Sequence, residues 1–177
     1  MSEALDDWLP EYSVRTYHRR AARASRDAVW LQARSIRLAD TGRLGKLVSW
    51  RIPGVEASQT YHELFRSYPF IVLQETATEL VSGLCGRIWT LARDYPNLRD
   101  AQAFADWDER GTVRVAFAHW VTESSEGAEL HSEARVSAVD LQARVRLKAV
   151  WALLGPFERL VGAEPLELAA RRAEAAR

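Results

Sequence analysis

The end of this sequence restricts the fold more than any other part of it. Two β-like runs, residues 112–122 and 129–139, are joined by a turn-like segment at 123–127. They lead straight into a helical segment that begins at Leu141 and is interrupted by Gly155-Pro156. A hairpin followed by a long helix with an apolar face predicts a sheet wrapped around that helix, with a pocket between the two.

The composition is that of an ordinary globular protein. The 177 residues fit a single domain, and 47% of them are hydrophobic and 27% are charged. The formal net charge is zero, so no global attraction to nucleic acid or to an anionic membrane is expected. Arg far outnumbers Lys, which is typical of GC-rich coding and indicates a bacterial protein.

The start of the chain lacks the features of a secretion signal. Residues 1–7 are acidic where a signal peptide is basic, and no apolar stretch follows them. The longest apolar run, residues 149–154, is far shorter than the ~20 residues that span a bilayer. We therefore expect a cytoplasmic protein with no membrane partner.

Charge is distributed unevenly along the chain. Residues 11–51 are rich in Arg, whereas residues 52–133 are rich in carboxylates. The basic segment is either a face that meets an acidic partner or a solvated surface on which the Arg residues are scattered. Homodimerisation is compatible with the sequence, although no pattern specifies an interface.

Hydrophobic periodicity predicts an α+β fold with an antiparallel sheet. The expected strands cover residues 12–20, 70–74, 80–89, 105–108, 112–122 and 129–139, and two short helices follow Ser25 and Leu44. The second helix should end at Pro53-Gly54, and residues 54–69 should be irregular apart from a turn of helix at His62. We expect one domain over residues 1–177, with 1–10 and 166–177 at its periphery.

The final helix has an apolar stripe. Its members recur three and four residues apart: Leu147, Val150, Trp151, Leu154, Phe157 and Val161. Pro156 lacks the backbone donor that a helix interior needs and clashes with the preceding turn, so the helix should bend or restart there. Gly162 and Pro165 break it again before a short tail. A helix of this kind packs imperfectly, which favours a cavity beneath it.

In its element order and in two segments, the chain resembles the START-like superfamily (SRPBCC, or helix-grip), which includes polyketide cyclase relatives. The segments are Glu79–Trp89 and Leu130–Val136, the second leading through Asp140–Arg144 into the helix with Trp151 and Gly155-Pro156. They are similar to the strand and helix patterns of small bacterial members. The resemblance implies a curved antiparallel sheet gripping the C-terminal helix, with a hydrophobic cavity between them. Activities in the superfamily differ widely, so no mechanism transfers.

Five side chains are candidates for lining that cavity: Arg87, Trp89, Phe117, His119 and Trp151. His119 is in phase with the apolar residues of 113–121. A neutral imidazole there either contacts a ligand, acts as a base near neutral pH, or bonds a core neighbour. Arg87 either enters the cavity, where it can pair with a ligand carboxylate, or points outward. Trp151 is either a ligand platform or core packing.

The strand at 129–139 leaves one choice open. His131, Glu133 and Arg135 alternate with apolar residues. On a solvent face these polar residues form a charge ladder of little energetic worth. In the opposite phase they line the pocket, where Glu133 and Arg135 become a buried acid and an anion binder. The apolar neighbours favour the first arrangement.

Motifs for catalysis, cofactors or metals do not stand out. The sequence lacks the Gly-rich phosphate loops and the Gly-x-Ser-x-Gly elbow. The four histidines show no close metal spacing. Cys85 is a single cysteine in an apolar run, which is typical of a small buried hydrophobe rather than a nucleophile. We therefore expect no cofactor and no metal, and we assign no catalytic residue.

Our first hypothesis is a domain that binds a small hydrophobic or amphipathic ligand between the sheet and the C-terminal helix. One alternative is a cyclase- or dehydratase-type enzyme that acts on a polyketide-like or aromatic substrate, with His119 or Glu133 as acid or base. Another is a protein-interaction module that uses the basic N-terminal face.

Overall fold

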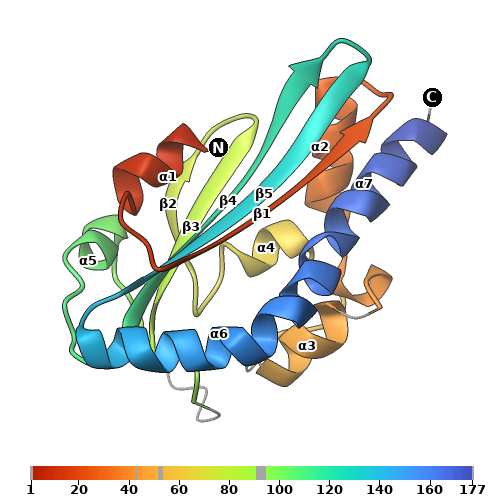
Figure 1. Cartoon of the computed structure of the whole chain (residues 1–177). Coiled ribbons are helices and arrows are strands. Elements are labelled where there is room, and N and C mark those ends of the chain that lie inside the picture. Colours follow the sequence, from red (N-terminus) through yellow and green to blue (C-terminus); the bar gives the residue numbers. More distant parts are fainter. Residues whose placement is uncertain (1, 43, 52–53, 91–94, 177) are drawn as a thin grey trace.

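A five-stranded antiparallel sheet in the order β1-β5-β4-β3-β2 forms the middle layer of the protein, with helices on both of its faces (Figure 1). The computed structural model describes residues 2–42, 44–51, 54–90 and 95–176, and within these ranges the side chains of residues 47, 49–51 and 153–162 are left out of the description. The α+β class, the antiparallel sheet and the C-terminal helix expected from the sequence are confirmed.

The elements follow one another in an order close to the predicted one. The strands are β1 (Val14–Ala22), β2 (Ile71–Glu75), β3 (Glu79–Gly86), β4 (Val113–Ser124) and β5 (Gly127–Ala138). The helices are α1 (Glu3–Trp8), α2 (Arg26–Ser35), the 3-10 helix η1 (Leu38–Asp40), α3 (Leu44–Arg51), α4 (Tyr61–Leu64), α5 (Ala101–Ala105), α6 (Leu141–Gly162) and α7 (Glu164–Ala175). The predicted end of the second helix at Pro53 lies outside the described residues.

The β4–β5 hairpin is the centre of the sheet. Its register runs from Ser124 opposite Gly127 at the turn to Val113 opposite Ala138 at the open end. β5 also pairs with β1, so the first strand of the chain lies beside the last one and forms an edge of the sheet. Because side chains alternate along a strand, this register fixes which residues of both strands share a face.

Helices α2, α4, α6 and α7 cover one face of the sheet (Figure 1). Trp30 of α2 and Leu166 of α7 belong to the same buried cluster as Leu130 of β5. Leu147 of α6 packs with the apolar residues near the other end of the sheet, among them Val136. The apolar stripe predicted on the last helix therefore faces the sheet at Leu147, while Leu154, Phe157 and Val161 lie outside the residues whose side chains are described.

Helices α1 and α5 cover the opposite face. Leu5 and Leu9, from α1 and the residue after it, join a second buried cluster with Phe104 of α5. The Phe104 ring lies directly on the backbone of Gly83, where an added Cβ would come within 2.6 Å of it. Glycine at this point of β3 therefore allows α5 to approach the sheet closely.

One predicted strand is absent. Residues 105–108 were expected to pair with 112–122, but α5 occupies 101–105 instead. Asp100 caps this helix, since its carboxylate accepts a hydrogen bond from the backbone N–H of Ala103 at 2.8 Å. The helix buries Phe104, and four residues of apparent alternation are too few to outweigh that contact.

Both ends of the chain are built into the fold, although the sequence led us to expect residues 1–10 and 166–177 at the periphery. Leu5 is fully buried, and Leu166, Ala169 and Ala173 are almost fully buried. The backbone of α6 is helical through Gly155-Pro156, so the restart expected at Pro156 comes later, between Gly162 and Glu164. The C-terminal helix therefore consists of two helices, and α7 packs along α2 and β1 (Figure 1).

The alternation predicted on β5 is present, but its polar side is buried under α1 rather than solvated. Glu133 and Arg135 have no exposed surface. The carboxylate of Glu133 accepts hydrogen bonds from Arg15 at 2.8 and 3.1 Å, from Arg135 at 2.9 Å and from the backbone N–H of Ser2 at 3.3 Å. Arg135 also donates to Asp6 on α1 at 2.6 Å. These bonds join β1, β5 and the N-terminal helix.

Removing the charge of Glu133 should destabilise the protein strongly. Burial raises the pKa of this carboxyl, but the bonds and charges of Arg15 and Arg135 outweigh burial and hold the pKa below its usual 4.5. In Glu133→Gln, buried Arg135 loses one of its two charged partners, with Asp6 remaining, and Arg15 loses its carboxylate partner. We therefore expect a loss of about 3–5 kcal/mol in the free energy of unfolding at pH 7. Urea titration monitored by circular dichroism measures it.

The matched control is Glu129→Gln on the same strand, where the carboxylate is partly exposed and 3.6 Å from Arg19; this variant should lose less than about 1 kcal/mol. The stabilisation from Glu133 is present above pH 4.5 and is lost as the pH falls through the lower pKa of its carboxyl in the folded protein. The difference in unfolding free energy between wild type and Glu133→Gln should therefore become smaller at acidic pH. Equal stability of the two proteins at pH 7 would contradict the proposed role.

Candidate functional site

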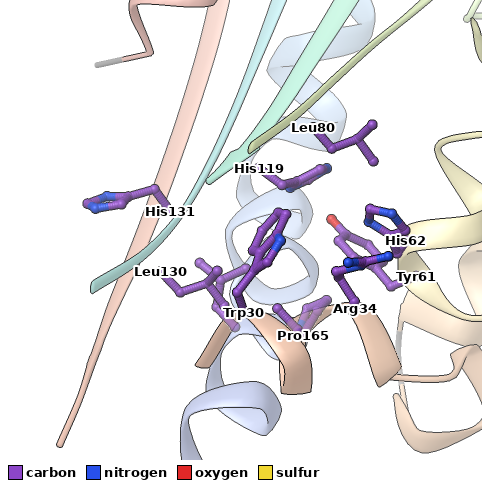
Figure 2. Close-up of a pocket in the computed structure, with 11 residues that line it drawn as sticks. Trp30, Arg34, Tyr61, His62, Leu80, His119, Leu130, His131 and Pro165 are labelled. Carbon is purple, nitrogen blue, oxygen red and sulfur yellow. The ribbon is translucent and has the colours of Figure 1, made fainter. Parts of the chain in front are cut away.

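The described residues line a crevice between the sheet and helices α2, α4 and α7 (Figure 2). The lining residues are Trp30, Ala33, Arg34, Tyr61, His62, Leu80, His119, Leu130, His131, Pro165 and Leu166. Non-atom space in the crevice amounts to about 380 Å³ with its open mouth included, but only about 20 Å³ of it admits the centre of a water molecule. In this conformation the crevice has room for one or two waters, which is far less than the cavity that the helix-grip resemblance implies.

Local capping places the helical residues of the crevice. Ser25 begins α2 by accepting a hydrogen bond from the N–H of Ala28 at 3.3 Å. A reciprocal capping box begins α4: the hydroxyl of Thr60 accepts from the N–H of Glu63, and the carboxylate of Glu63 accepts from the N–H of Thr60. These caps fix where each helix starts, and so which of its residues turn toward the sheet.

His119 is the polar side chain at the sheet side of the crevice. It is only 7% exposed, and its ring lies 4.5 Å from that of Phe65 and 5.1 Å from that of Tyr61, measured between centroids. Its Nε2 is buried and has no hydrogen-bond partner among the described residues. Burial, assisted by the nearby His62, lowers the pKa of His119 to about 3. The imidazole is therefore neutral at pH 7.

His62 and Arg34 lie toward the mouth. Burial and the charge of Arg34 lower the pKa of His62, although Glu75, whose Oε1 is 3.4 Å from Nε2, acts in the opposite direction. Arg34 is exposed. The half-buried imidazole of His62 and the exposed guanidinium of Arg34 thus line the same narrow space.

Three of the predicted cavity residues extend this region along the same face of the sheet. Phe117, Trp89 and Trp151 pack against one buried cluster. Phe65 connects that cluster to the crevice, since its ring centroid is 5.0 Å from that of Phe117 and 4.5 Å from that of His119. The structure therefore brings His119 and Phe117 together, with Trp89 and Trp151 further along the sheet.

Arg87 is not part of this group. β3 ends at Gly86, whose positive φ of 132° turns the chain, so Arg87 does not continue the alternation of the strand. Its side chain is exposed and lies 3.5 Å from the carboxylate of Glu109. Of the two orientations that the sequence left open, the structure has the outward one.

His131 touches the crevice, but its ring points away from it (Figure 2). The hydroxyl of Tyr17 is 2.8 Å from Nδ1 and that of Thr122 is 2.9 Å from Nε2, so both ring nitrogens are hydrogen-bonded. The ring also stacks on Trp120 at 4.8 Å. Glu133 lies on this same far face, so it cannot act with His119 as an acid–base pair.

Cys85 is the single cysteine of the sequence, and it is buried. Burial raises the pKa of Cys85 to about 12 against the weaker effect of Arg114, so this thiol stays protonated. The described residues contain no group of three or more His, Cys, Asp or Glu that could hold a metal ion. In the same part of the chain, no helix combines the length and the apolar composition needed to cross a membrane.

The sequence analysis missed the helical side of the crevice. Trp30, Arg34 and Tyr61 were not proposed as site residues. One usable signal was the Thr60-x-x-Glu63 pattern, which is typical of a helix start and places Tyr61 and His62 in the first turn. No comparable signal marks Arg34, because a single Arg in a basic segment does not reveal which space it faces.

No protein-family model matches the chain, and no curated protein matches it either. Among solved structures, the chain is similar to the X-ray crystal structure of protein CV1439 from Chromobacterium violaceum. The two share 9% sequence identity, the alignment covers 90% of this chain and 97% of that one, and the TM-score is 0.30. A similarity this weak supports no conclusion about fold or function.

Replacing His119 by Phe should not destabilise the protein. The Phe ring has a similar shape and lacks the buried Nε2 atom, which has no hydrogen-bond partner among the described residues. We therefore expect the substitution to leave the free energy of unfolding unchanged or to raise it by about 1–2 kcal/mol. His131→Phe is the matched control: it leaves two hydroxyls without their partner and should lose about 1–3 kcal/mol. Chemical denaturation of both variants at pH 7.5 measures the difference. A large loss of unfolding free energy in His119→Phe would show that the imidazole stabilises the fold.

The same variant should change how stability depends on pH. Unfolded His119 binds a proton near pH 6.5, whereas the folded protein binds it only near pH 3. Wild-type stability therefore falls as the pH drops from 6.5 toward 3, by about 1.4 kcal/mol per pH unit from this group. His119→Phe lacks that contribution, so the difference between the two proteins in unfolding free energy should widen in favour of the variant between pH 6 and pH 4. A constant difference would show that His119 is protonated in the folded protein.

Proposed function

We propose that this protein binds a small amphipathic molecule in the crevice, with His119 hydrogen-bonding the polar group of that molecule. The main observation behind the proposal is the buried Nε2 of His119, which has no partner among the described residues. A buried polar atom left unsatisfied costs about 1–3 kcal/mol, a considerable part of the 5–15 kcal/mol that keeps a typical domain folded. A ligand that hydrogen-bonds to Nε2 would remove this cost in the complex.

The walls of the crevice suit a partly apolar ligand. Trp30 and Tyr61 present aromatic surface, Leu80 and Leu130 present aliphatic surface, and His119 adds a polar atom. Binding sites for small molecules typically combine apolar walls with a few polar groups in this way. The sequence led us to expect this pocket under the helix that begins at Leu141, whereas the crevice lies between the sheet and helices α2, α4 and α7.

Binding is better supported than acid–base catalysis. With a pKa of about 3, His119 is not an imidazolium at pH 7, so it cannot act as a general acid, and it is a weak base. Glu133, the other candidate for acid–base work, is paired with two Arg residues on the opposite face of the sheet. The alternative of a cyclase or dehydratase using these residues therefore loses its two proposed groups.

The ligand must widen the crevice as it enters. The present space admits water but not an aromatic ring. Arg34 lines the opening and is exposed, so its side chain can swing into solvent at little cost. Such an adjustment belongs to the ordinary side-chain changes that accompany binding.

Titration of the protein with phenol, indole, benzoate and octanoate tests the proposal. We expect at least one compound to shift the imidazole nitrogen signals of His119 in ¹H–¹⁵N spectra, since Nε2 gains a hydrogen bond, and to leave those of His131 in place. His119→Phe should weaken that binding about tenfold, which corresponds to 1.4 kcal/mol.

His131→Phe serves as the control for binding, because its ring points to the far face of the sheet, and its affinity should stay within about twofold of wild type. Native mass spectrometry of freshly purified protein adds an independent measurement, since a retained molecule identifies itself by mass. If none of the four compounds alters the His119 signals and no molecule is retained, ligand binding at this crevice is refuted.

A further inference from the structure

Arg34 has no counter-charge among the described residues, unlike its neighbours Arg37 and Arg66. Arg37 pairs with Asp40 at 3.2 Å, Arg66 with Glu75 at 3.4 Å, and both partners belong to neighbouring elements or the same turn. Within the described residues, no carboxylate lies within 4.0 Å of the Arg34 guanidinium. Arg34 lines the mouth of the crevice, so its charge is available to whatever enters.

The rest of the lining also favours a negative group. The described lining residues include no Asp or Glu. In Figure 2 the indole nitrogen of Trp30 is turned toward the side of the crevice where Arg34 and Tyr61 lie, and the hydroxyl of Tyr61 points toward His119. Indole N–H and guanidinium groups are hydrogen-bond donors only. The guanidinium of Arg34 therefore gives the mouth a positive charge without a carboxylate of its own, while the nearby carboxylate of Glu75 lies against His62 and Arg66. The inner end at His119 is neutral.

Resting on the proposed function, we propose that the ligand is a small carboxylic acid with an aromatic or apolar body. Its carboxylate pairs with Arg34 at the mouth, its body lies between Trp30 and Tyr61, and a neutral polar group at its other end hydrogen-bonds His119. A guanidinium matches a carboxylate with two parallel hydrogen bonds. At the exposed mouth this pair forms without the full desolvation that a buried ion pair requires.

Three related compounds separate the two ends of such a ligand. 4-Hydroxybenzoate has a carboxylate and a hydroxyl at opposite ends of one ring, 4-hydroxybenzamide replaces the carboxylate by a neutral amide, and benzoate lacks the hydroxyl. Calorimetry at pH 7 should show that 4-hydroxybenzoate binds wild type about tenfold more tightly than 4-hydroxybenzamide. In Arg34→Gln this preference should disappear, while the amide keeps its affinity within about twofold.

The control for net charge is Arg110→Gln. The side chain of Arg110 is almost fully exposed and precedes the start of β4, whereas His119 lies in the middle of that strand. Its removal changes the total charge as Arg34→Gln does and should leave the affinity for 4-hydroxybenzoate within about twofold. In His119→Phe, 4-hydroxybenzoate and benzoate should bind equally, because the hydroxyl loses its partner.

The possible results distinguish this inference from the function on which it rests. If the acid and the amide bind equally and Arg34→Gln changes neither, while both still shift the His119 signals, the assignment of a carboxylic acid is overturned and ligand binding stands. If none of the three compounds shifts the His119 signals, both the inference and the proposed function are overturned. A preference for the acid that survives in Arg34→Gln likewise overturns the role of Arg34.

Discussion

The buried charges on β5 fix the orientation of the whole sheet. Glu133 and Arg135 can be buried only on the face where Arg15 of β1 and Asp6 of α1 supply partners. A slip of one residue in the β4–β5 register would move both charges into the apolar layer under α2 and α7. The free-energy cost of burying unpaired charges there is far larger than the stabilisation from a hydrogen bond between the strands. The same register turns His119 toward the helices, so the crevice depends on a charge cluster on the other side of the sheet.

The sequence predicted the parts of the fold that repeat a pattern over many residues. The two strands of the central hairpin and the helix after Ser25 were recognisable because alternation and helical spacing persist for ten residues or so. The elements that were missed or misjudged are short or depend on one tertiary contact. α5 forms because Phe104 fits over Gly83, and α1 is held by the bonds around Glu133; neither contact can be seen in a local pattern.

The sequence predicted on which face of the sheet His119 lies, but not which helical residues lie opposite it in the crevice. The phase of His119 followed from its strand, and Phe117 followed with it. Arg87 was proposed because it lies in an otherwise apolar run, with its orientation left open, but the strand ends before it at Gly86, whose φ is positive. The helical half of the crevice, with Trp30 and Arg34, required knowledge of how α2 packs on the sheet. Periodicity identifies the buried side of a helix, but not the residues at the rim of a space that it encloses.

The two ends of the crevice impose opposite demands on a ligand, and these demands determine how it lies. The inner end is buried, so a charged group there would lose its hydration without a counter-ion, because His119 is neutral. A neutral donor or acceptor loses less hydration free energy and gains a hydrogen bond with Nε2 of His119. The narrow space also admits water, and a group that replaces such a water must reproduce its hydrogen bond or lose affinity. In the proposed complex the charged end therefore stays at Arg34, where solvent still hydrates the ion pair, and the neutral polar end points inward.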